Sequence, residues 1–419
     1  YRRQRQMCIR DRNKLAYDLI RGIPQMVGLR TQFVHLYVKD NTEEPGGKFE
    51  DYGIYTQVEQ LNKTALKSHG LDSNGQLYKI NSFEFYRYED IIKKEDDAGY
   101  DKTAFEKMLE IKGDSDHTKL IDMLTDLNDY SIGIEDVLKE HFDEENIVYW
   151  MAFQILMGNV DTQNRNVYLY SPLNSDIWYF IAWDNDGCLM RPEYELRNFS
   201  DQNSWEKGIS NYWGNILFQR CLKSRSFREK LNDAILDLRE YLNKDMLTSK
   251  IESYKNVLKP YLYLMPDAEY EPLTSEQYDQ IAASLPDEIE KNYQLYLESL
   301  ETPMPFYIGV PTIDGDKLKF NWDVSYDLDA EDITYSVEVA GDYLFRDVIY
   351  QNTTLTVPEA EMDLPKAGQY FVRVRATNTS GKTQDAFDYY VTDEGKYYGM
   401  RCFYITEDST VEEDDYEEG

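Results

Sequence analysis

Hydrophobic residues follow two different periods along the chain, and the change of period divides it into two regions. Before residue 300, apolar residues mostly recur at helical spacing, as at 120–127, 134–141, 145–157, 215–222, 227–242 and 250–262. After residue 306 they alternate in short runs between turn residues, at 318–322, 334–339, 354–357, 370–376 and 387–391. The pattern predicts an α+β domain followed by an all-β sandwich.

The first region also contains predicted strands, at 34–38, 53–58 and 77–80. Three further helices are expected there. One covers residues 13–30 and is broken by Gly22 and Pro24, a second covers 103–111, and a third covers 275–300 and is interrupted by Pro286.

A predicted hairpin in the first region carries acidic and amide residues at its ends. Residues 167–170 and 178–183 are aromatic and β-branched, which favours paired strands. Asp161 and Asn166 precede the first strand, and Asp184 ends the second, followed by Asn185-Asp186-Gly187. Carboxylate and amide oxygens are ligands that Mg²⁺ uses together with phosphate oxygens and water. The arrangement therefore predicts a phosphoryl-transfer site.

The spacing supports this interpretation. Protein kinases hold their metal ions with an aspartate that follows a strand and an asparagine five residues after the catalytic aspartate. Asp161, Asn166 and Asp184 have that order and that spacing, although Asn159-Val160 replaces the usual His-Arg. The alternative is an ordinary hairpin whose Asp and Asn residues serve as turn and capping residues, where both are common.

Residues 142–187, FDEENIVYWMAFQILMGNVDTQNRNVYLYSPLNSDIWYFIAWDNDG, resemble the core of the spore-coat-protein-H (CotH) kinase family. The resemblance extends upstream through residues 52–59 and 75–79 and covers roughly residues 13 to 300. It implies an atypical protein-kinase-like, two-lobed domain with an N-terminally truncated small lobe and a helical large lobe. It also implies Asp161 as catalytic base, Asn166 and Asp184 as metal ligands, and Lys79 on the nucleotide phosphates.

Two further residues complete the predicted site. In a kinase small lobe an acid positions the strand lysine, and Glu59 is assigned this role beside Lys79. Asp186 is assigned as an alternate metal ligand. The alternative for Lys79 is an ordinary solvated lysine at a strand end. The implied cofactors are ATP and Mg²⁺ or Mn²⁺, and the implied partner is a protein with a Ser or Thr acceptor.

The second region, residues 306–405, resembles a fibronectin type III domain. Trp322 lies on an early strand, and Leu364 lies six residues before Tyr370, whose hydroxyl would tie its strand to the preceding corner. Residues 301–305 are a predicted linker, and residues 406–419 a predicted acidic tail.

Composition narrows the possible partners and location. The 419 residues carry a formal net charge of −33, which argues against nucleic acid as a partner. The chain contains no run of 18 apolar residues, so no membrane span is predicted. The four cysteines form no short-spaced pair, so neither a disulfide framework nor a zinc site is expected. Residues 1–12, with five Arg against one Asp, are predicted to be a non-native head.

The sequence thus favours an ATP-dependent protein kinase. One alternative is a catalytically weak, kinase-like scaffold or adhesion protein that uses its fibronectin-like module, with surface or coat proteins as partners. Another is a sugar-nucleotide transferase built on Asp184 and Asp186. The acidic chain with a fibronectin-like module favours an extracellular or cell-surface bacterial protein.

Overall fold

The computed structural model describes residues 7–40, 42, 47–196, 205–271, 273–392 and 395–413, with side chains from residue 11 onward. The predicted head and acidic tail therefore lie partly outside the described residues. The chain forms two compact units, of which unit 1 comprises Tyr1–Ser200 and Asn215–Gln294 and unit 2 comprises Asp201–Gly214 and Leu295–Gly419. Among the described residues, no helix combines the length and hydrophobicity needed to cross a bilayer.

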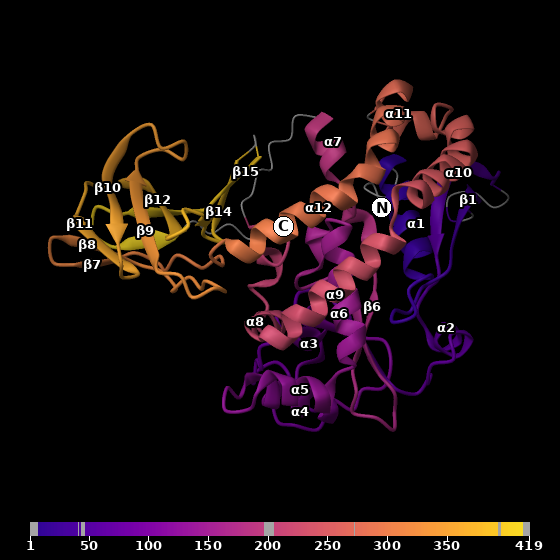
Figure 1. Cartoon of the computed structure of the whole chain (residues 1–419), viewed down its shortest axis with the longest axis horizontal. Coiled ribbons are helices and arrows are strands. Elements are labelled where there is room, and N and C mark those ends of the chain that lie inside the picture. The colour runs from indigo at the N-terminus through magenta and orange to yellow at the C-terminus, as the bar shows by residue number, and fades with distance from the viewer. Residues whose placement is uncertain are drawn as a thin grey trace. The chain divides into compact units, whose positions relative to one another are not determined.

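Unit 1 is mostly helical (Figure 1). Its helices are α1 (Met7–Ile20), α2 (Lys63–Ser68), α3 (Lys102–Met108), α4 (Thr118–Asn128), α5 (Ile134–His141), α6 (Glu144–Leu156), α7 (Arg191–Leu196), α8 (Ile216–Lys223), α9 (Arg225–Tyr241), α10 (Lys244–Leu262), α11 (Ser275–Ser284) and the first part of α12 (Glu288–Glu301). Helix α6 is apolar nearly all round and packs against α9 and strand β6, so it forms the centre of the unit.

Two sheets complete unit 1. Strands β1 (Thr31–Val38) and β2 (Glu50–Val58) form an antiparallel pair. A second antiparallel sheet has the order β4-β3-β5-β6, from β4 (Leu109–Ile111), β3 (Gln76–Ile80), β5 (Val167–Ser171) and β6 (Tyr179–Ala182). The predicted hairpin is confirmed as β5 and β6, in which Val167 lies opposite Ala182.

Several predicted elements differ from the structure. The predicted helix 103–111 ends at Met108, and residues 109–111 form β4 beside β3 instead, because this edge position offers backbone partners to a short extended segment. The first helix ends at Ile20, before Gly22. The interruption at Pro286 is confirmed, since the short 3-10 turn Leu285–Asp287 separates α11 from α12.

Residues 7–12, which belong to the predicted non-native head, lie in helix α1. There the guanidinium of Arg12 is buried and forms an ion pair of 2.9 Å with Glu193. The origin of the head stays a prediction, but residues 11 and 12 belong to the packed interior of unit 1.

Unit 2 contains a sandwich of two antiparallel sheets, one with the order β11-β8-β7 and one with the order β10-β9-β12-β16-β17, in which β13 also pairs with β12. The strands are β7 (Thr312–Asp314), β8 (Lys317–Asn321), β9 (Ile333–Ala340), β10 (Val348–Leu355), β11 (Glu359–Asp363), β12 (Gly368–Asn378), β13 (Thr383–Asp385), β16 (Met400–Ile405) and β17 (Val411–Glu413), with a separate pair β14 (Tyr389–Thr392) and β15 (Gly395–Tyr398).

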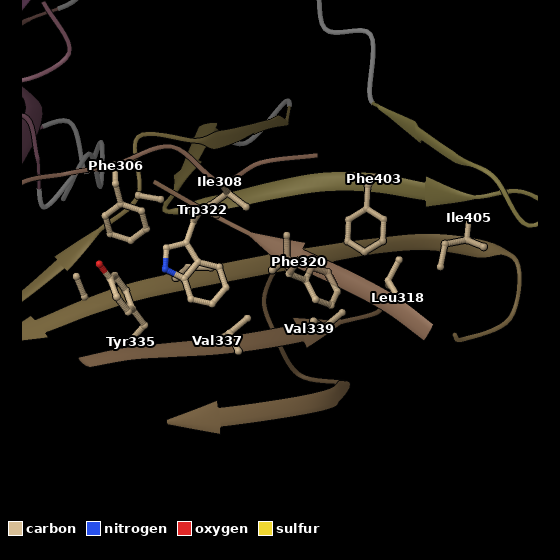
Figure 2. Packing of buried hydrophobic residues seen from close by; sticks show 14 residues of the cluster. Phe306, Ile308, Leu318, Phe320, Trp322, Tyr335, Val337, Val339, Phe403 and Ile405 are labelled. Carbon is tan, nitrogen blue, oxygen red and sulfur yellow. The ribbon is translucent and has the colours of Figure 1, made fainter. Parts of the chain in front are cut away.

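Alternate residues of the two sheets form the core of the sandwich. Figure 2 shows Phe320 from β8 and Trp322, which follows β8, beside Val337 and Val339 from β9 and Phe403 from β16. The period-2 pattern of the sequence therefore supplies one apolar face to each sheet.

The predicted tie at Tyr370 is also present. Its hydroxyl donates a hydrogen bond of 2.9 Å to the carbonyl of Lys366, four residues upstream. This bond joins β12 to the corner that precedes it.

Candidate functional site

Asn166 and Asp184 meet at one end of the β5–β6 hairpin. Asn166 directly precedes β5, Asp184 follows β6 by two residues, and the backbone N–H of Trp183 donates to the carbonyl of Asn166 at 3.2 Å. Antiparallel pairing therefore brings together residues that lie 18 positions apart in the chain.

Both residues have left-handed backbone conformations, with φ of 59° at Asn166 and 49° at Asp184. Asn and Asp adopt this region more readily than other residues with a side chain. The backbone N–H of Asp184 donates to the hydroxyl of Tyr17 at 3.0 Å, so helix α1 helps to hold this turn. Such conformations are often found at functional sites that the surrounding structure holds in place.

Asp161 lies in the short 3-10 turn Val160–Thr162 and contacts Asn166 directly. The Nδ2 of Asn166 donates to the carboxylate Oδ2 of Asp161 at 2.8 Å and to its backbone carbonyl at 3.0 Å. This use of the amide N–H groups leaves the Oδ1 of Asn166 as an acceptor. The side chain of Asp161 is 49% exposed, so a substrate can reach its carboxylate.

The charges of Asp161, Asp184 and Lys79 interact. Burial raises the pKa of the Asp184 carboxyl, the negative charge of Asp161 raises it further, and the positive charge of Lys79 opposes the shift. Two carboxylates of like charge therefore lie near one lysine. A bound cation would relieve the repulsion between them.

Lys79 reaches this end of the sheet from β3, where it lies opposite Tyr168 of β5 and Glu110 of β4. Directly opposite residues share one face of an antiparallel sheet. On this face Leu77, Tyr168 and Ile181 are buried with Tyr17 of α1. Lys79 therefore lies on the side of the sheet that faces helix α1. The Tyr17 hydroxyl of this helix accepts the hydrogen bond from the backbone N–H of Asp184.

Glu59 does not join this group. Its carboxylate forms an ion pair with Arg30 and another of 2.7 Å with the ring of His69. Burial alone would raise the pKa of Glu59, but the hydrogen bonds from Arg30 and His69 outweigh it and lower the pKa to about 2. The predicted role of Glu59 in positioning Lys79 therefore has no support in the contacts of Glu59, because its carboxylate is used at the end of β2.

The end of the hairpin thus carries the amide of Asn166, whose oxygen can accept a bond, together with two carboxylates and a lysine. A model of the family described as CotH kinase protein matches residues 10–296, which is more than half of the chain. The chain belongs to the CotH kinase protein family. The resemblance predicted over residues 13–300 is thus confirmed. A comparison with curated proteins finds no match.

Membership of the CotH kinase family suggests a kinase-like function and, with it, ATP and a divalent metal ion. The residues fit such an ion, because the Oδ1 of Asn166 and the carboxylate of Asp184 are hard oxygen ligands on one hairpin end. Mg²⁺ is commonly held by one or two carboxylates, with the remaining ligands supplied by phosphates and water.

Asp186 lies in the short 3-10 turn Asn185–Gly187 that follows Asp184. The carboxylates of Asp161, Asp184 and Asp186 do not form a compact cluster in which all three lie within 4.8 Å of one another. In the described part of the chain, the side chains that form such a cluster are Asp126 on α4 and Glu140 and His141 on α5. There Asp126 and His141 form an ion pair of 2.8 Å.

Three buried amides near the site are absent from the sequence-based assignment. Gln154 of α6 accepts a hydrogen bond of 2.9 Å from Asn159 and donates one of 3.3 Å to Asn185. The signal in the sequence is the single uncharged polar side chain of Gln154 within the apolar run 147–157. A buried amide in such a run requires polar partners, and these lie on the two site loops.

Proposed function

We propose that this CotH kinase family protein is an atypical protein kinase that transfers the γ-phosphoryl group of ATP to a Ser or Thr hydroxyl of a protein. The observation that carries the proposal is the contact of Asn166 with Asp161 at the hairpin end where Asp184 and Lys79 interact. In kinases the protein contributes mainly positioning and charge stabilisation, and these residues are of the types that supply both.

Asp161 is the proposed catalytic base. Its carboxylate is half-exposed and accepts one hydrogen bond from Asn166, whose Nδ2 also donates to the backbone carbonyl of Asp161. In this role Asp161 accepts a hydrogen bond from the acceptor hydroxyl, orients its oxygen toward the phosphoryl group and takes its proton. Arg165, whose Nε lies 3.7 Å from the Asp161 carboxylate, places a positive charge beside it.

Asn166 and Asp184 are the proposed metal ligands, and Asp186 is a proposed further ligand from the adjacent turn. A bound Mg²⁺ or Mn²⁺ would neutralise charge on the transferred phosphoryl group. The raised pKa of Asp184 supports this assignment, because a carboxylate destabilised by burial and by Asp161 gains from a cation. Lys79 is proposed to bind nucleotide phosphates from the neighbouring strand β3.

We propose that unit 1 is the kinase-like, two-lobed domain and that the sandwich of unit 2 is a fibronectin type III-like module. The sandwich is supported by the two sheet orders, β11-β8-β7 and β10-β9-β12-β16, and by the bond between Tyr370 and Lys366. The candidate catalytic residues all belong to unit 1.

Phosphate transfer from radiolabelled ATP tests the proposal. The wild-type chain, incubated with Mn²⁺ and a mixture of proteins, should label itself or a protein acceptor, and Asp161→Ala and Asp184→Ala should each reduce labelling at least about 100-fold. Asp126→Ala is the matched control, because it removes an acidic side chain from the α4–α5 group. Equal labelling by all four proteins would overturn the assignment.

A nucleotide panel separates the kinase from a sugar-nucleotide transferase. The kinase predicts that ATP with Mg²⁺ raises the melting temperature of the wild type and not that of Asp184→Ala. Stabilisation by a UDP-sugar in place of ATP would contradict the proposal.

A further inference from the structure

Gln154 links the two loops that carry the candidate site residues. Its Oε1 accepts a hydrogen bond of 2.9 Å from the Nδ2 of Asn159, two residues before Asp161. Its Nε2 donates one of 3.3 Å to the Oδ1 of Asn185, the residue after Asp184. All three side chains are buried, with Gln154 and Asn185 fully inaccessible and Asn159 2% exposed.

Two polar atoms of this group have no partner. The Oδ1 of Asn159 and the Nδ2 of Asn185 are both buried and make no hydrogen bond. A buried amide atom without a partner has lost its bond to water and gained none from the protein, so such atoms need an explanation. The unused acceptor is the Oδ1 of Asn159 and the unused donor is the Nδ2 of Asn185. Both amides already form a hydrogen bond with Gln154.

The directions of the hydrogen bonds are consistent with a closed ring. Asn159 donates to Gln154 and Gln154 donates to Asn185. A bond from the Nδ2 of Asn185 to the Oδ1 of Asn159 would give each of the three amides one donated and one accepted bond. No side chain would need to reverse its amide.

The packing brings the two loops close at this point. A Cβ placed on Gly187 would lie 2.5 Å from the Oδ1 of Asn159 and 3.5 Å from the Cβ of Asp161. Gly187 belongs to the same short 3-10 turn as Asn185. The unpaired oxygen of Asn159 therefore lies directly against the turn that carries the unpaired N–H group.

We propose that Gln154 is a positioning residue that couples the Asp161 loop to the Asp184 loop, and that the bond between Asn185 and Asn159 forms when a divalent cation binds. This inference rests on the proposed function, because a cation shared by Asn166 and Asp184 is what draws the loops together. The closed ring would hold both loops in the geometry that binds the ion.

Manganese binding with ADP, followed by electron paramagnetic resonance, tests the coupling. Gln154→Met keeps the length of the side chain and removes both hydrogen bonds, and we expect it to weaken Mn²⁺ binding about 10- to 100-fold, as is typical when a partner that orients metal ligands is lost. Gln154→Glu keeps an acceptor for Asn159 and loses the donor to Asn185, so it should also weaken binding.

Asn146→Leu is the matched control. Asn146 is a buried amide on the same helix that forms hydrogen bonds to the backbone of Gln25 and Phe180 and none to the site loops. Its loss should lower the melting temperature and leave Mn²⁺ affinity unchanged in the folded protein. If Asn146→Leu weakened Mn²⁺ binding as much as Gln154→Met, the effect of Gln154 would be general destabilisation and the coupling would be overturned.

The outcomes separate the coupling from the proposed function. If the wild type shows no Mn²⁺ binding that depends on Asp184, the proposed function fails. If the wild type binds Mn²⁺ and both Gln154 variants bind it equally well, the coupling alone fails. A crystal structure with Mn²⁺ and ADP gives a direct readout, since closure requires Nδ2 of Asn185 about 2.7–3.2 Å from Oδ1 of Asn159.

Discussion

Two antiparallel hairpins of this protein use charged residues in opposite ways. In unit 2, the β7–β8 hairpin pairs Asp314 with Lys319, and Lys317 pairs with Asp363 at 2.6 Å. The hydrogen bond from Lys319 lowers the pKa of Asp314. In unit 1, the end of the β5–β6 hairpin brings Asp184 near Asp161, and the pKa of Asp184 is raised.

The backbone shows the same contrast. The turn of the β7–β8 hairpin has its left-handed residue at Gly315, where no side chain is strained. At the β5–β6 hairpin the left-handed positions are Asn166 and Asp184, two of the proposed metal ligands. The β7–β8 hairpin thus pairs opposite charges around a glycine turn, whereas the β5–β6 hairpin keeps like charges and left-handed residues with side chains, which a bound ion would offset.

The largest change in stability is expected from a substitution that opens a cavity in the sandwich beside the β7–β8 hairpin. Phe320 of β8 is buried and packs edge-to-face against Phe403 of the other sheet, with ring centroids 6.1 Å apart. We expect Phe320→Ala to cost about 3–5 kcal/mol, because the truncated ring leaves a cavity between the sheets. Hydrogen exchange of peptides from β8 and β9 measures the loss, and unchanged protection in those strands would contradict this account of the hairpin.

Much of this contrast could be predicted from the sequence. The β5–β6 hairpin and helices α4, α5 and α6 match the predictions closely because their apolar residues repeat at the period of the element and turn or capping residues bound them. The predicted hairpin carries Asp161, Asn166 and Asp184 at its ends, and the structure adds the contact between Asp161 and Asn166.

Other features could not be predicted, for identifiable physical reasons. Strand β11 alternates, but its partly buried face offers only Ala360 and Met362 between three acids. Strand β10 is a largely exposed edge strand without a clear apolar alternation. The partners of Glu59 are 29 and 10 residues away in sequence, and only the fold decides that they, rather than Lys79, take its carboxylate. The amide group around Gln154 likewise depends on tertiary packing.

A smaller effect is expected at Glu59. Glu59→Gln should cost about 1 kcal/mol at neutral pH, because the amide loses the ion pair with Arg30 and weakens the contact with the ring of His69. The native carboxyl has a pKa of about 2, below its ordinary value of about 4.3. Its stabilising contribution is therefore present above about pH 4.3 and is lost as the pH falls toward 2. Denaturation with urea at several pH values measures this trend.

The same variant separates structure from nucleotide binding. If Glu59 acts only at the end of β2, Glu59→Gln should leave ATP affinity unchanged, and Lys79→Met should weaken it. A loss of ATP affinity in Glu59→Gln equal to that in Lys79→Met would restore Glu59 to the site and contradict the contacts described above.

The smallest effect compares one aspartate from each hairpin. Asp184→Asn should raise the melting temperature of the metal-free protein by about 1–3 °C at neutral pH. The amide removes the repulsion from Asp161, and asparagine tolerates the left-handed backbone at this position. Because the folded pKa of Asp184 is raised, the penalty of its charge sets in above the ordinary unfolded pKa of about 3.9 and is complete above the folded pKa. The gain should therefore disappear as the pH falls below about 3.9.

Asp314→Asn should have the opposite sign. Asp314 is exposed and paired with Lys319, so its replacement should lower the melting temperature slightly and should leave Mn²⁺ binding unchanged. Scanning calorimetry of both variants with and without Mn²⁺ measures the comparison, and Asp184→Asn alone should lose stabilisation by the ion. If Asp184→Asn instead destabilised the metal-free protein, the carboxylate of Asp184 would be a structural group like that of Asp314, and the contrast between the hairpins would not hold.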